Sequence, residues 1–405
     1  MKRFKKYAEG MLLVAFGLLV MLSGCADEKI NLTSFDKQKI EPDPVIRSIV
    51  PAGTAGGGVS EIIIKGENFP TDVKDVAVYV NSMQAKVTGT SAEQIAILRP
   101  NISGDALTIK VVSKNALLAA TLSPYKITTV QEPYGTLAPS EIVESFDVDL
   151  SENLYTCLDT KFLLKLTPDG QRSEFGTLKY RSSDVKIGPQ GILYLFCGQN
   201  QVYRLESEGQ ESARWLTVGK RVGYGDFDEN GNLYTAGKKT DIITIRPDES
   251  FFPAGKYADF EIRSLRVFDH SVYSIAEYVG DDASIAQLAI WKNAISADGQ
   301  LGDSELVLDW ASVGAYADSA SSMYSITFSK DGEMYIGTNL ADPILVMKNG
   351  TVEPLYPGIL TPTVGNLVWG EGNYLYATVI DAQGSTRLIR IDVGKPGAAY
   401  FGRNL

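Results

Sequence analysis

Hydrophobic and polar residues alternate in short runs between residues 44 and 130. Residues 61–65 read Glu-Ile-Ile-Ile-Lys, and similar runs occupy residues 76–80, 95–98 and 107–112. Such runs, separated by Gly, Asn and Pro, are typical of strands that bury one face, because successive side chains of a strand point to opposite sides. Their number and spacing predict a small β-sandwich of immunoglobulin-like size over residues 44–130.

A second pattern organises the rest of the chain. Residues 224–236 read Tyr-Gly-Asp-Phe-Asp-Glu-Asn-Gly-Asn-Leu-Tyr-Thr-Ala, which predicts two strands joined by a tight turn. This hairpin recurs along the chain with a period near 40 residues, which is that of a four-stranded propeller blade. The chain is therefore predicted to be all-β, with the sandwich followed by a six-bladed β-propeller over residues 131–405. The tyrosine that ends the hairpin occurs six times, at intervals of 39, 40, 39, 62 and 41 residues: Tyr155, Tyr194, Tyr234, Tyr273, Tyr335 and Tyr376.

The interval of 62 residues shows that the fourth blade carries extra chain. Comparison with the first blade assigns the surplus to two segments, around residues 279–289 and around residues 310–322. In a propeller, the loop after the second strand and the crossing to the next blade emerge on the same face. Both segments are therefore predicted to enlarge one face, and long loops on a rigid scaffold often bind ligands. Ring closure is expected between residues 396–405 and the segment before Phe146.

Aromatic and charged residues are expected to gather on this loop-rich face. Trp and Tyr beside carboxylates suit a sugar, whose C–H face stacks on an aromatic ring while its hydroxyls bond to the carboxylates. The alternative is ordinary loop composition, with Trp310 packed against the fourth blade. The predicted ligand-binding residues are Tyr278, Asp281, Asp282, Trp310, Tyr316, Asp318, Tyr180, Arg181, Arg221 and Tyr224.

The N-terminus has the pattern of a lipoprotein signal peptide over residues 1–24. Basic residues come first, and the apolar residues 11–21 that follow are too few to cross about 30 Å of hydrocarbon as a helix. Leu-Ser-Gly-Cys at residues 22–25 resembles the bacterial lipobox, which implies cleavage before Cys25 and diacylation of that thiol, so that the acylated Cys25 anchors the chain in outer-membrane lipid. The acidic residues after Cys25 resemble an export signal of surface lipoproteins. We therefore expect cell-surface exposure, with residues 25–43 as a flexible tether.

Two further sets of residues carry family resemblances. The sequence Gly-Glu-Asn-Phe follows a strand at residues 66–69, after Ile-Val-Pro at residues 49–51 and three glycines at residues 56–58. Together they resemble the IPT/TIG family of Ig-like domains, which implies that the Gly and Asn shape a turn, that the Phe enters the core, and that the domain is a spacer or binding module. The hairpins at residues 226–235 and 329–336 are similar to NHL and gluconolactonase-like propeller repeats, a resemblance to a repeat and to no one activity.

Charge and composition limit the chemistry. The 405-residue chain has a formal charge of −11, and loss of residues 1–24, which carry +3, would leave −14. Nucleic acid is not an expected partner, because binding to phosphates needs clustered Lys and Arg. His270 is the only histidine, which argues against a zinc site or a Ser/His/Asp triad. It is predicted to be a polar turn residue on the face opposite the enlarged loops.

Two acidic patterns are predicted to be structural. Residues 226–231 match the first half of a calcium loop, but the twelfth position is Gly237 where a Glu is required, so turn chemistry explains the match. Gluconolactonase-like propellers gather Glu, Asp and Asn near the channel around a divalent metal, whereas the residues here mix signs and favour ion pairing. No catalytic residue, metal or cofactor is predicted. The channel residues, eight before each tyrosine and with one deletion in blade four, are Asp147, Lys186, Asp226, Arg266, Thr327 and Val368.

Together these features predict a lipid-anchored surface protein that binds an extracellular ligand, with a glycan favoured. A protein-interaction scaffold is one alternative, and a propeller hydrolase, lactonase or lyase is another. The layout is similar to that of surface lipoproteins that capture glycans beside outer-membrane transporters, so such a transporter is an expected candidate partner.

Overall fold

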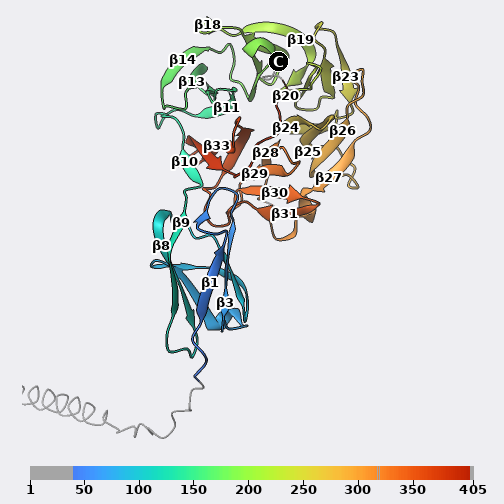
Figure 1. The fold of residues 1–405 in the computed structure, drawn as a ribbon. Helices are drawn as coiled ribbons and strands as arrows, with labels where there is room; N and C mark the ends of the chain where they lie inside the picture. The colour runs from blue at the N-terminus through green and yellow to red at the C-terminus, as the bar shows by residue number, and fades with distance from the viewer. Residues whose placement is uncertain (1–39, 317, 319, 402–405) are drawn as a thin grey trace, which may run out of the picture.

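The computed structural model describes residues 40–316, 318 and 320–401. The predicted signal peptide, Cys25 and the tether up to residue 39 lie outside the described residues. The described chain forms a small sandwich of strands, followed by a ring of six sheets (Figure 1). The predicted fold class, an Ig-like β-sandwich followed by a six-bladed propeller, is confirmed. Within the described ranges, no helix has the length and apolar character needed to span a membrane.

Two packed sheets enclose the core of the sandwich. Their strand orders are β1-β3-β7-β6 and β2-β9-β8-β4-β5. Alternate side chains of the central strands are buried, for example Ile62 and Ile64 in β3, because the strands expose only one face. The strands are β1 (Val45–Val50), β2 (Thr54–Ala55), β3 (Glu61–Glu67), β4 (Val76–Val80), β5 (Met83–Ala85), β6 (Val87–Ser91), β7 (Gln94–Leu98), β8 (Gly104–Ser113) and β9 (Ala120–Ile127).

The Gly-Glu-Asn-Phe motif has the structural role that its resemblance implied. A Cβ atom on Gly66 would lie 1.8 Å from the carbonyl oxygen of Val45, so no other residue fits there. Asn68 has a φ of 60°, in the left-handed region that Asn tolerates. Phe69 is buried in the sandwich core. The motif therefore shapes a turn and adds one aromatic ring to the core.

Each propeller blade is a four-stranded antiparallel sheet whose first strand lines the centre of the ring (Figure 1). The buried face of each blade packs on its neighbours, so the core is a series of clusters between blades. Blades one to three contain β11 (Val143–Val148), β12 (Leu154–Leu158), β13 (Phe162–Leu166) and β14 (Arg172–Thr177); β15 (Asp184–Ile187), β16 (Leu193–Phe196), β17 (Gln199–Leu205) and β19 (Ala213–Val222); and β20 (Tyr224–Phe227), β21 (Leu233–Ala236), β22 (Ile242–Ile245) and β23 (Phe251–Gly255). Blades four to six contain β24 (Phe260–Phe268), β25 (Ser271–Tyr278), β26 (Leu288–Ala294) and β27 (Glu305–Asp309); β28 (Met323–Phe328), β29 (Met334–Thr338), β30 (Ile344–Lys348) and β31 (Thr351–Pro354); and β32 (Val364–Trp369), β33 (Tyr374–Ile380), β34 (Thr386–Asp392) and β10 (Gln131–Pro133). A short strand, β18 (Gln210–Glu211), adds to the edge of blade one.

The tyrosine repeat marks the same position in every blade. Each tyrosine lies directly opposite a residue of the innermost strand, which confirms the predicted set of channel residues, including the deletion in blade four. The pairs are Tyr155 with Asp147, Tyr194 with Lys186, Tyr234 with Asp226, Tyr273 with Arg266, Tyr335 with Thr327 and Tyr376 with Val368.

Asp228 organises the turn of the third-blade hairpin. Its Oδ1 accepts hydrogen bonds from the backbone N–H groups of Asn230 (2.9 Å) and Asn232 (2.8 Å). Its Oδ2 accepts hydrogen bonds from the side-chain amide of Asn232 (2.8 Å) and the hydroxyl of Tyr234 (3.1 Å). The calcium-like pattern is therefore turn chemistry, as predicted.

Asp149 repeats this arrangement in the first blade. Its Oδ1 accepts from the N–H groups of Ser151 (2.8 Å) and Asn153 (2.9 Å), and its Oδ2 from the Asn153 side chain (2.8 Å) and the Tyr155 hydroxyl (3.4 Å). Asp149 is half-buried, whereas Asp228 is buried. The two aspartates thus accept equivalent hydrogen bonds but differ in how deeply they are buried.

The ring closes in a way that differs from the expectation. Strand β10 forms the outermost strand of the sixth blade, with Gln131 opposite Ile391 and Pro133 opposite Ile389. The expectation that residues 396–405 pair with the segment before Phe146 was wrong, because the strand that pairs with β10 is β34. The described part of residues 396–405 instead contacts the fifth blade, where Gly397 bridges to Ser329.

The C-terminal segment, residues 395–401, covers the channel on the hairpin side. Lys395 forms ion pairs with Asp331 (2.8 Å) and Glu333 (2.7 Å). The hydroxyl of Tyr400 lies 2.7 Å from the Thr327 hydroxyl and accepts a hydrogen bond from the backbone N–H of Trp369 (2.9 Å). This segment therefore connects blades five and six across the channel.

Acid is expected to release this segment. The hydrogen bond from Lys395 lowers the pKa of Asp331. Burial acts to raise the pKa of Glu333, but Lys348 and Lys395 outweigh it and the pKa is lowered. Lowered folded-state values mean that the stabilisation is complete above the ordinary values of 3.8 and 4.5 and is lost as the pH falls through the folded-state values. The Ala398 N–H donates a hydrogen bond to the carbonyl oxygen of Phe328 (2.9 Å). Hydrogen exchange at this amide, corrected for intrinsic rate, should be slow at neutral pH and fast in acid.

The control for this prediction is Lys395→Met, which should make the Ala398 amide exchange rapidly at both pH values. Equal protection of Ala398 in the unsubstituted protein at neutral and acidic pH would show that these ion pairs do not hold the segment.

A buried arginine organises the end of the sandwich that meets the propeller. The Arg99 guanidinium donates hydrogen bonds to the carbonyl oxygens of Gly56 (2.6 Å), Val59 (3.3 Å) and Thr128. Burial lowers the pKa of Arg99. Thr128 belongs to the connection between the two parts of the chain, so Arg99 fixes both the glycine loop and this connection.

Tyr356 of the propeller completes the contact between the sandwich and the ring. Its hydroxyl accepts a hydrogen bond from the N–H of Gly58 (2.5 Å) and donates one to the carbonyl oxygen of Asp392 (2.6 Å). The Arg99 guanidinium lies 5.9 Å from the centre of the Tyr356 ring, within cation–π range. We call Arg99 and Tyr356, with the backbone groups that they bind, the domain seam.

Candidate functional site

The two enlarged segments of blade four lie on the same face of the propeller. Residues 279–287 connect β25 to β26, and residues 310–322 connect β27 to β28. The first follows the second strand of the blade and the second follows the fourth strand, so both emerge at the edge opposite the hairpin turns. The prediction that both segments enlarge one face is therefore confirmed. The second segment forms one wall of a cleft of about 550 Å³ on this face, to which the first segment contributes Gln287.

The lining of this cleft mixes polar and apolar side chains and comes from strands of blade four and from both loops. The Arg263 guanidinium forms an ion pair with Glu277 and donates a hydrogen bond to the Ser322 hydroxyl (2.7 Å). We call this site the blade-four cleft; its lining residues are Arg263, Glu277, Gln287, Leu288, Asp309, Trp310, Ala311, Asp318, Ala320, Ser321 and Ser322.

Short-range hydrogen bonds hold the second loop in place. Asp309 caps the 3₁₀ turn η4 (Trp310–Ser312), since its Oδ1 accepts the N–H of Ala311 (3.0 Å). The Ser321 hydroxyl accepts hydrogen bonds from the Trp310 indole (3.0 Å) and from the N–H of Asp318 (2.9 Å). The loop is thus a folded wall of the cleft.

Trp310 is part of this wall and does not offer a stacking surface. Only 5% of it is exposed, and it packs in the core cluster between blades four and five, together with the half-buried Tyr316. This arrangement is the packing alternative considered for Trp310.

The first loop curls over its own strand. The hydroxyl of Tyr278 accepts a hydrogen bond from the N–H of Asp282 (3.2 Å), and the Tyr278 ring contacts Phe260 with centroids 5.1 Å apart. The Ser284 hydroxyl and N–H both bond to the Asp282 carboxylate and lower its pKa. Asp282 therefore serves the loop structure, and Asp281 is exposed beside it.

The predicted residues of the earlier blades lie elsewhere on this face. Tyr180 is exposed and makes an edge contact with Tyr203, and Arg181 forms ion pairs with Asp159 (3.1 Å) and Glu144 (3.3 Å). The cleft brings together only two of the ten predicted residues, Trp310 and Asp318. Those outside its lining are Tyr278, Asp281, Asp282, Tyr316, Tyr180, Arg181, Arg221 and Tyr224.

β-Bulges place a second set of polar residues at the loop-side mouth of the channel. The register of the inner strand shifts at the same level in blades one, four, five and six, at Glu144, Arg263, Tyr324 and Gly365-Asn366. A bulge re-aims a side chain without breaking the sheet. Arg263 therefore belongs both to the mouth and to the cleft, so the cleft is continuous with the inner strand of its blade.

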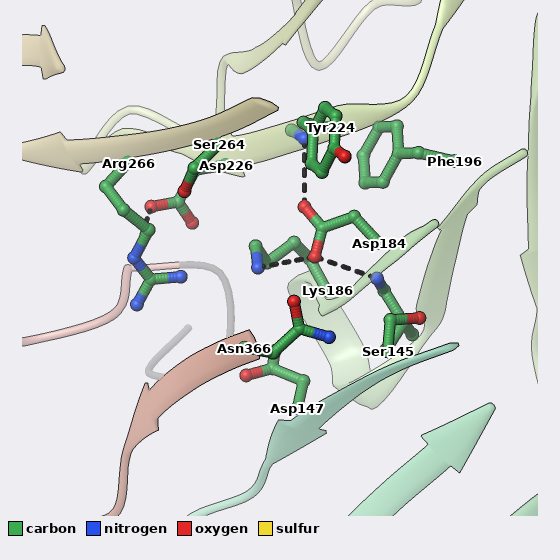
Figure 2. Close-up of polar contacts among 12 residues, drawn as sticks. Ser145, Asp147, Asp184, Lys186, Phe196, Tyr224, Asp226, Ser264, Arg266 and Asn366 are labelled. Atoms are coloured by element: carbon green, nitrogen blue, oxygen red, sulfur yellow. Dashed lines mark hydrogen bonds and ion pairs between the residues drawn. The ribbon is translucent and has the colours of Figure 1, made fainter. Parts of the chain in front are cut away.

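The channel itself is held by buried ion pairs and by bonds between blades. Figure 2 shows Asp184 between Lys186, with which it forms an ion pair of 2.9 Å, and the start of the third blade's inner strand. Burial raises the pKa of Asp184. Each channel aspartate accepts a hydrogen bond from the N–H of the next blade: Asp147 from Ile187 (2.8 Å), Asp184 from Gly225 (3.2 Å) and Asp226 from Val267 (2.9 Å).

Arg266 completes the channel on the hairpin side. It is 3% exposed, lies 3.7 Å from Asp226, and stacks at 4.1 Å on the ring of Tyr400. The predicted ion pairing is confirmed for Arg266 and Asp226, whereas Lys186 pairs with Asp184, which the tyrosine count did not include. Across the described ranges, no three His, Cys, Asp or Glu side chains are grouped to hold a metal ion.

His270 lies where the sequence predicted it, in the turn between β24 and β25. Its Nδ1 is 3.0 Å from the Glu229 carboxylate, and its side chain is exposed. This turn is on the face opposite the cleft.

Comparison with known proteins identifies the sandwich and supports the overall architecture. Residues 44–128 match the IPT/TIG domain family. No curated protein matches the sequence. An auxiliary nutrient binding protein from Bacteroides thetaiotaomicron has a similar structure, with 13% identity, a TM-score of 0.51, and coverage of 86% of this chain and 97% of that one.

Two other solved structures are similar to a smaller share of this chain. A luciferin-regenerating enzyme aligns with a TM-score of 0.51 at 16% identity, covering 67% of this chain and 98% of that one. A gluconolactonase from Xanthomonas campestris aligns with a TM-score of 0.49 at 13% identity, covering 78% and 97%. At these identities, the similarity to the luciferin-regenerating enzyme and to the nutrient binding protein shows the fold alone.

Proposed function

We propose that this chain is a lipid-anchored surface protein that binds a neutral extracellular glycan in the blade-four cleft. The observation that carries the proposal is that the two long departures from the blade period emerge on one face and border one cleft there, the first through Gln287 and the second through the loop from Trp310 to Ser322. Its volume of about 550 Å³ lies within the range of about 300–1,000 Å³ that is usual for small-ligand sites.

The lining favours a ligand rich in hydroxyl groups. Asp309 and Asp318 each use one carboxylate oxygen to hold the loop, and their second oxygens make no hydrogen bond among the described residues. The side chain of Gln287 is likewise without a hydrogen bond within the described ranges. Carboxylate and amide groups bind vicinal hydroxyls as acceptors and donors.

The charge of the lining argues against an acidic sugar. Glu277 neutralises Arg263, which leaves the two negative charges of Asp309 and Asp318. A uronic acid or a sialic acid would bring a further carboxylate into this site and be repelled. Neutral hexoses and their oligomers are therefore the expected class.

Binding accounts for the polar groups better than catalysis does. Asp147, Asp184 and Asp226 bond to the backbone of the neighbouring blades, so they act as links within the ring. The similar Bacteroides protein is named as an auxiliary nutrient binding protein, and the predicted acylation of Cys25 would display this chain beside an outer-membrane transporter. Such a transporter would receive the captured glycan.

Calorimetric titration of the chain from Cys25 onward against a panel of neutral and uronic-acid-bearing oligosaccharides tests the proposal. We expect binding of a neutral member, weakened at least tenfold by Gln287→Ala and by Asp318→Asn, which keeps the oxygen that accepts the Ala320 N–H, with the thermal midpoint unchanged. The matched control is Gln171→Ala, on an exposed turn of the opposite face. A panel without a binding neutral glycan, or affinity that neither cleft variant changes, would overturn the proposal.

A further inference from the structure

An exposed apolar turn lies at the end of the sandwich that is remote from the propeller. Residues 114–119 connect β8 to β9 and end in Ala-Leu-Leu-Ala, and Leu117 and Leu118 are 73% and 68% exposed. Turns normally carry Gly, Asn, Asp or Ser, and a run of exposed apolar residues indicates a contact surface. We call residues 114–119 the leucine turn.

Hydrogen bonds hold this turn in its outward conformation. The Oδ1 atom of Asp43 accepts the N–H groups of both Leu117 (2.9 Å) and Leu118 (2.8 Å). The N–H of Glu41 bonds to the carbonyl oxygen of Asn115 (3.1 Å), and Asn115 adopts a φ of 64°. The leucines are therefore presented by a fixed backbone, and the residues that fix it are the last ones of the predicted tether.

The position of the turn relates it to the anchor. Gly104 of β8 pairs with Ile127 of β9 near the propeller, so the leucine turn is at the opposite end of both strands. Figure 1 shows that the described chain begins at this end of the sandwich, below the ring. Two further exposed apolar residues, Ile40 and Val73, belong to segments that contact the turn.

The charges near the turn are largely engaged. Lys114 pairs with Asp75 (2.8 Å), and Asp72 accepts the N–H of Lys74 (2.9 Å). Asp43 is occupied by the two leucine N–H groups. The tip is thus an apolar turn whose flanking carboxylates bond to Lys114 or to backbone N–H groups, and its exposed leucines suit the hydrocarbon of a lipid leaflet better than a strongly charged partner.

We infer that the leucine turn inserts into the lipid leaflet that carries the acylated Cys25. This inference rests on the lipid anchor of the proposed function. The tether from Cys25 to Asp43 has a reach of about 60 Å when extended, so it permits contact but does not enforce it. Two leucines bind a membrane weakly by themselves, but an anchored chain holds them at high effective concentration beside the surface. Insertion of the turn then sets the sandwich upright, with the propeller at the outer end.

Tryptophan quenching by lipid tests this inference directly. The chain from Cys25 onward, carrying Leu118→Trp, is coupled through the Cys25 thiol to a maleimide lipid in phosphatidylcholine vesicles with brominated acyl chains. Cys157 is buried and Cys197 half-buried, and burial raises the pKa of both thiols, to about 11 for Cys197, so Cys25 reacts first. All four native tryptophans, Trp215, Trp291, Trp310 and Trp369, lie in the propeller, so the unsubstituted protein provides the background.

We expect bromolipid to reduce the fluorescence of the added tryptophan at least twofold. The matched control, Leu150→Trp on an exposed turn of the propeller, should show no quenching, and Leu117→Asp in the Leu118→Trp protein should abolish it. Equal signals from residues 118 and 150 would overturn the inference. So would photocrosslinking from residue 118 to an outer-membrane protein without lipid quenching, because the turn would then dock on protein.

The outcome is separate from that of the glycan titration. Chemical coupling supplies the anchor whether or not the cell acylates Cys25, and the leucine turn is remote from the blade-four cleft. Loss of quenching therefore rejects only the membrane contact, whereas loss of glycan binding rejects only the cleft.

Discussion

Replacing Asp228 with alanine is expected to lower the free energy of unfolding of the propeller by about 3 kcal/mol. The substitution removes the acceptor of four hydrogen bonds, three of them from the buried Asn232 and Tyr234. Each donor left unsatisfied in a buried place costs about 1–3 kcal/mol, with partial relief where water can enter. Urea unfolding followed by tryptophan fluorescence measures this change, because every tryptophan of the chain lies in the propeller.

Asp149→Ala is the matched control for that prediction. Asp149 accepts the same four hydrogen bonds in blade one, but it is half-buried, so water replaces more of the lost contacts. Its substitution should therefore cost clearly less than that of Asp228. Equal losses for the two variants, or a loss below about 1 kcal/mol for Asp228→Ala, would show that the turn is not held by this carboxylate.

The second large effect is expected at the domain seam, where Arg99→Met should loosen the sandwich from the propeller. Methionine fills the space of the aliphatic stem but leaves the carbonyl oxygens of Gly56, Val59 and Thr128 without their donor. It also removes the cation from the face of Tyr356. We expect a loss of about 3 kcal/mol in the stability of the sandwich, together with a larger radius of gyration in small-angle scattering.

Arg47→Met provides the comparison within the same sandwich. Arg47 forms an ion pair with Glu67 at 2.9 Å, but its side chain is exposed, so its loss should change neither stability nor scattering measurably. If Arg99→Met behaves like Arg47→Met, the seam is held by backbone contacts alone.

Much of the fold could be predicted because its signals repeat. The period of the hairpin tyrosines identified six blades, and the register of each tyrosine opposite residues such as Asp147 and Arg266 followed from counting. The surplus in blade four was found for the same reason: a departure from a period is visible without coordinates. The turn role of Asp228 followed from the missing ligand at the twelfth position of the calcium pattern.

Other features leave no periodic signal. A bulge inserts one residue into a strand without ending the alternation around it, so the aim of Arg263 and its pairing with Glu277 were missed. Closure of the ring by β10 depends on three residues only, Gln131–Pro133, too few to read as a strand. Gln287 was also missed, although it lies in the predicted loop, because the choice rested on aromatic rings.

The site prediction located the face better than the residues. Trp310 and Asp318 line the cleft, but the indole of Trp310 is directed into the core and bonds to Ser321. An aromatic residue in a long loop has two uses, as a contact for a ligand and as the packing that folds the loop. The sequence contains no feature that separates these uses for Trp310.

The closure strand also determines how the protein carries mechanical load. Only residues 128–130 separate β9 of the sandwich from β10, and β10 is the outer strand of the last blade. In an anchored chain with a bound ligand, as we propose, tension would pass from the sandwich into β10, the strand that keeps the ring shut. A pull strong enough to strip β10 from β34 would open the ring.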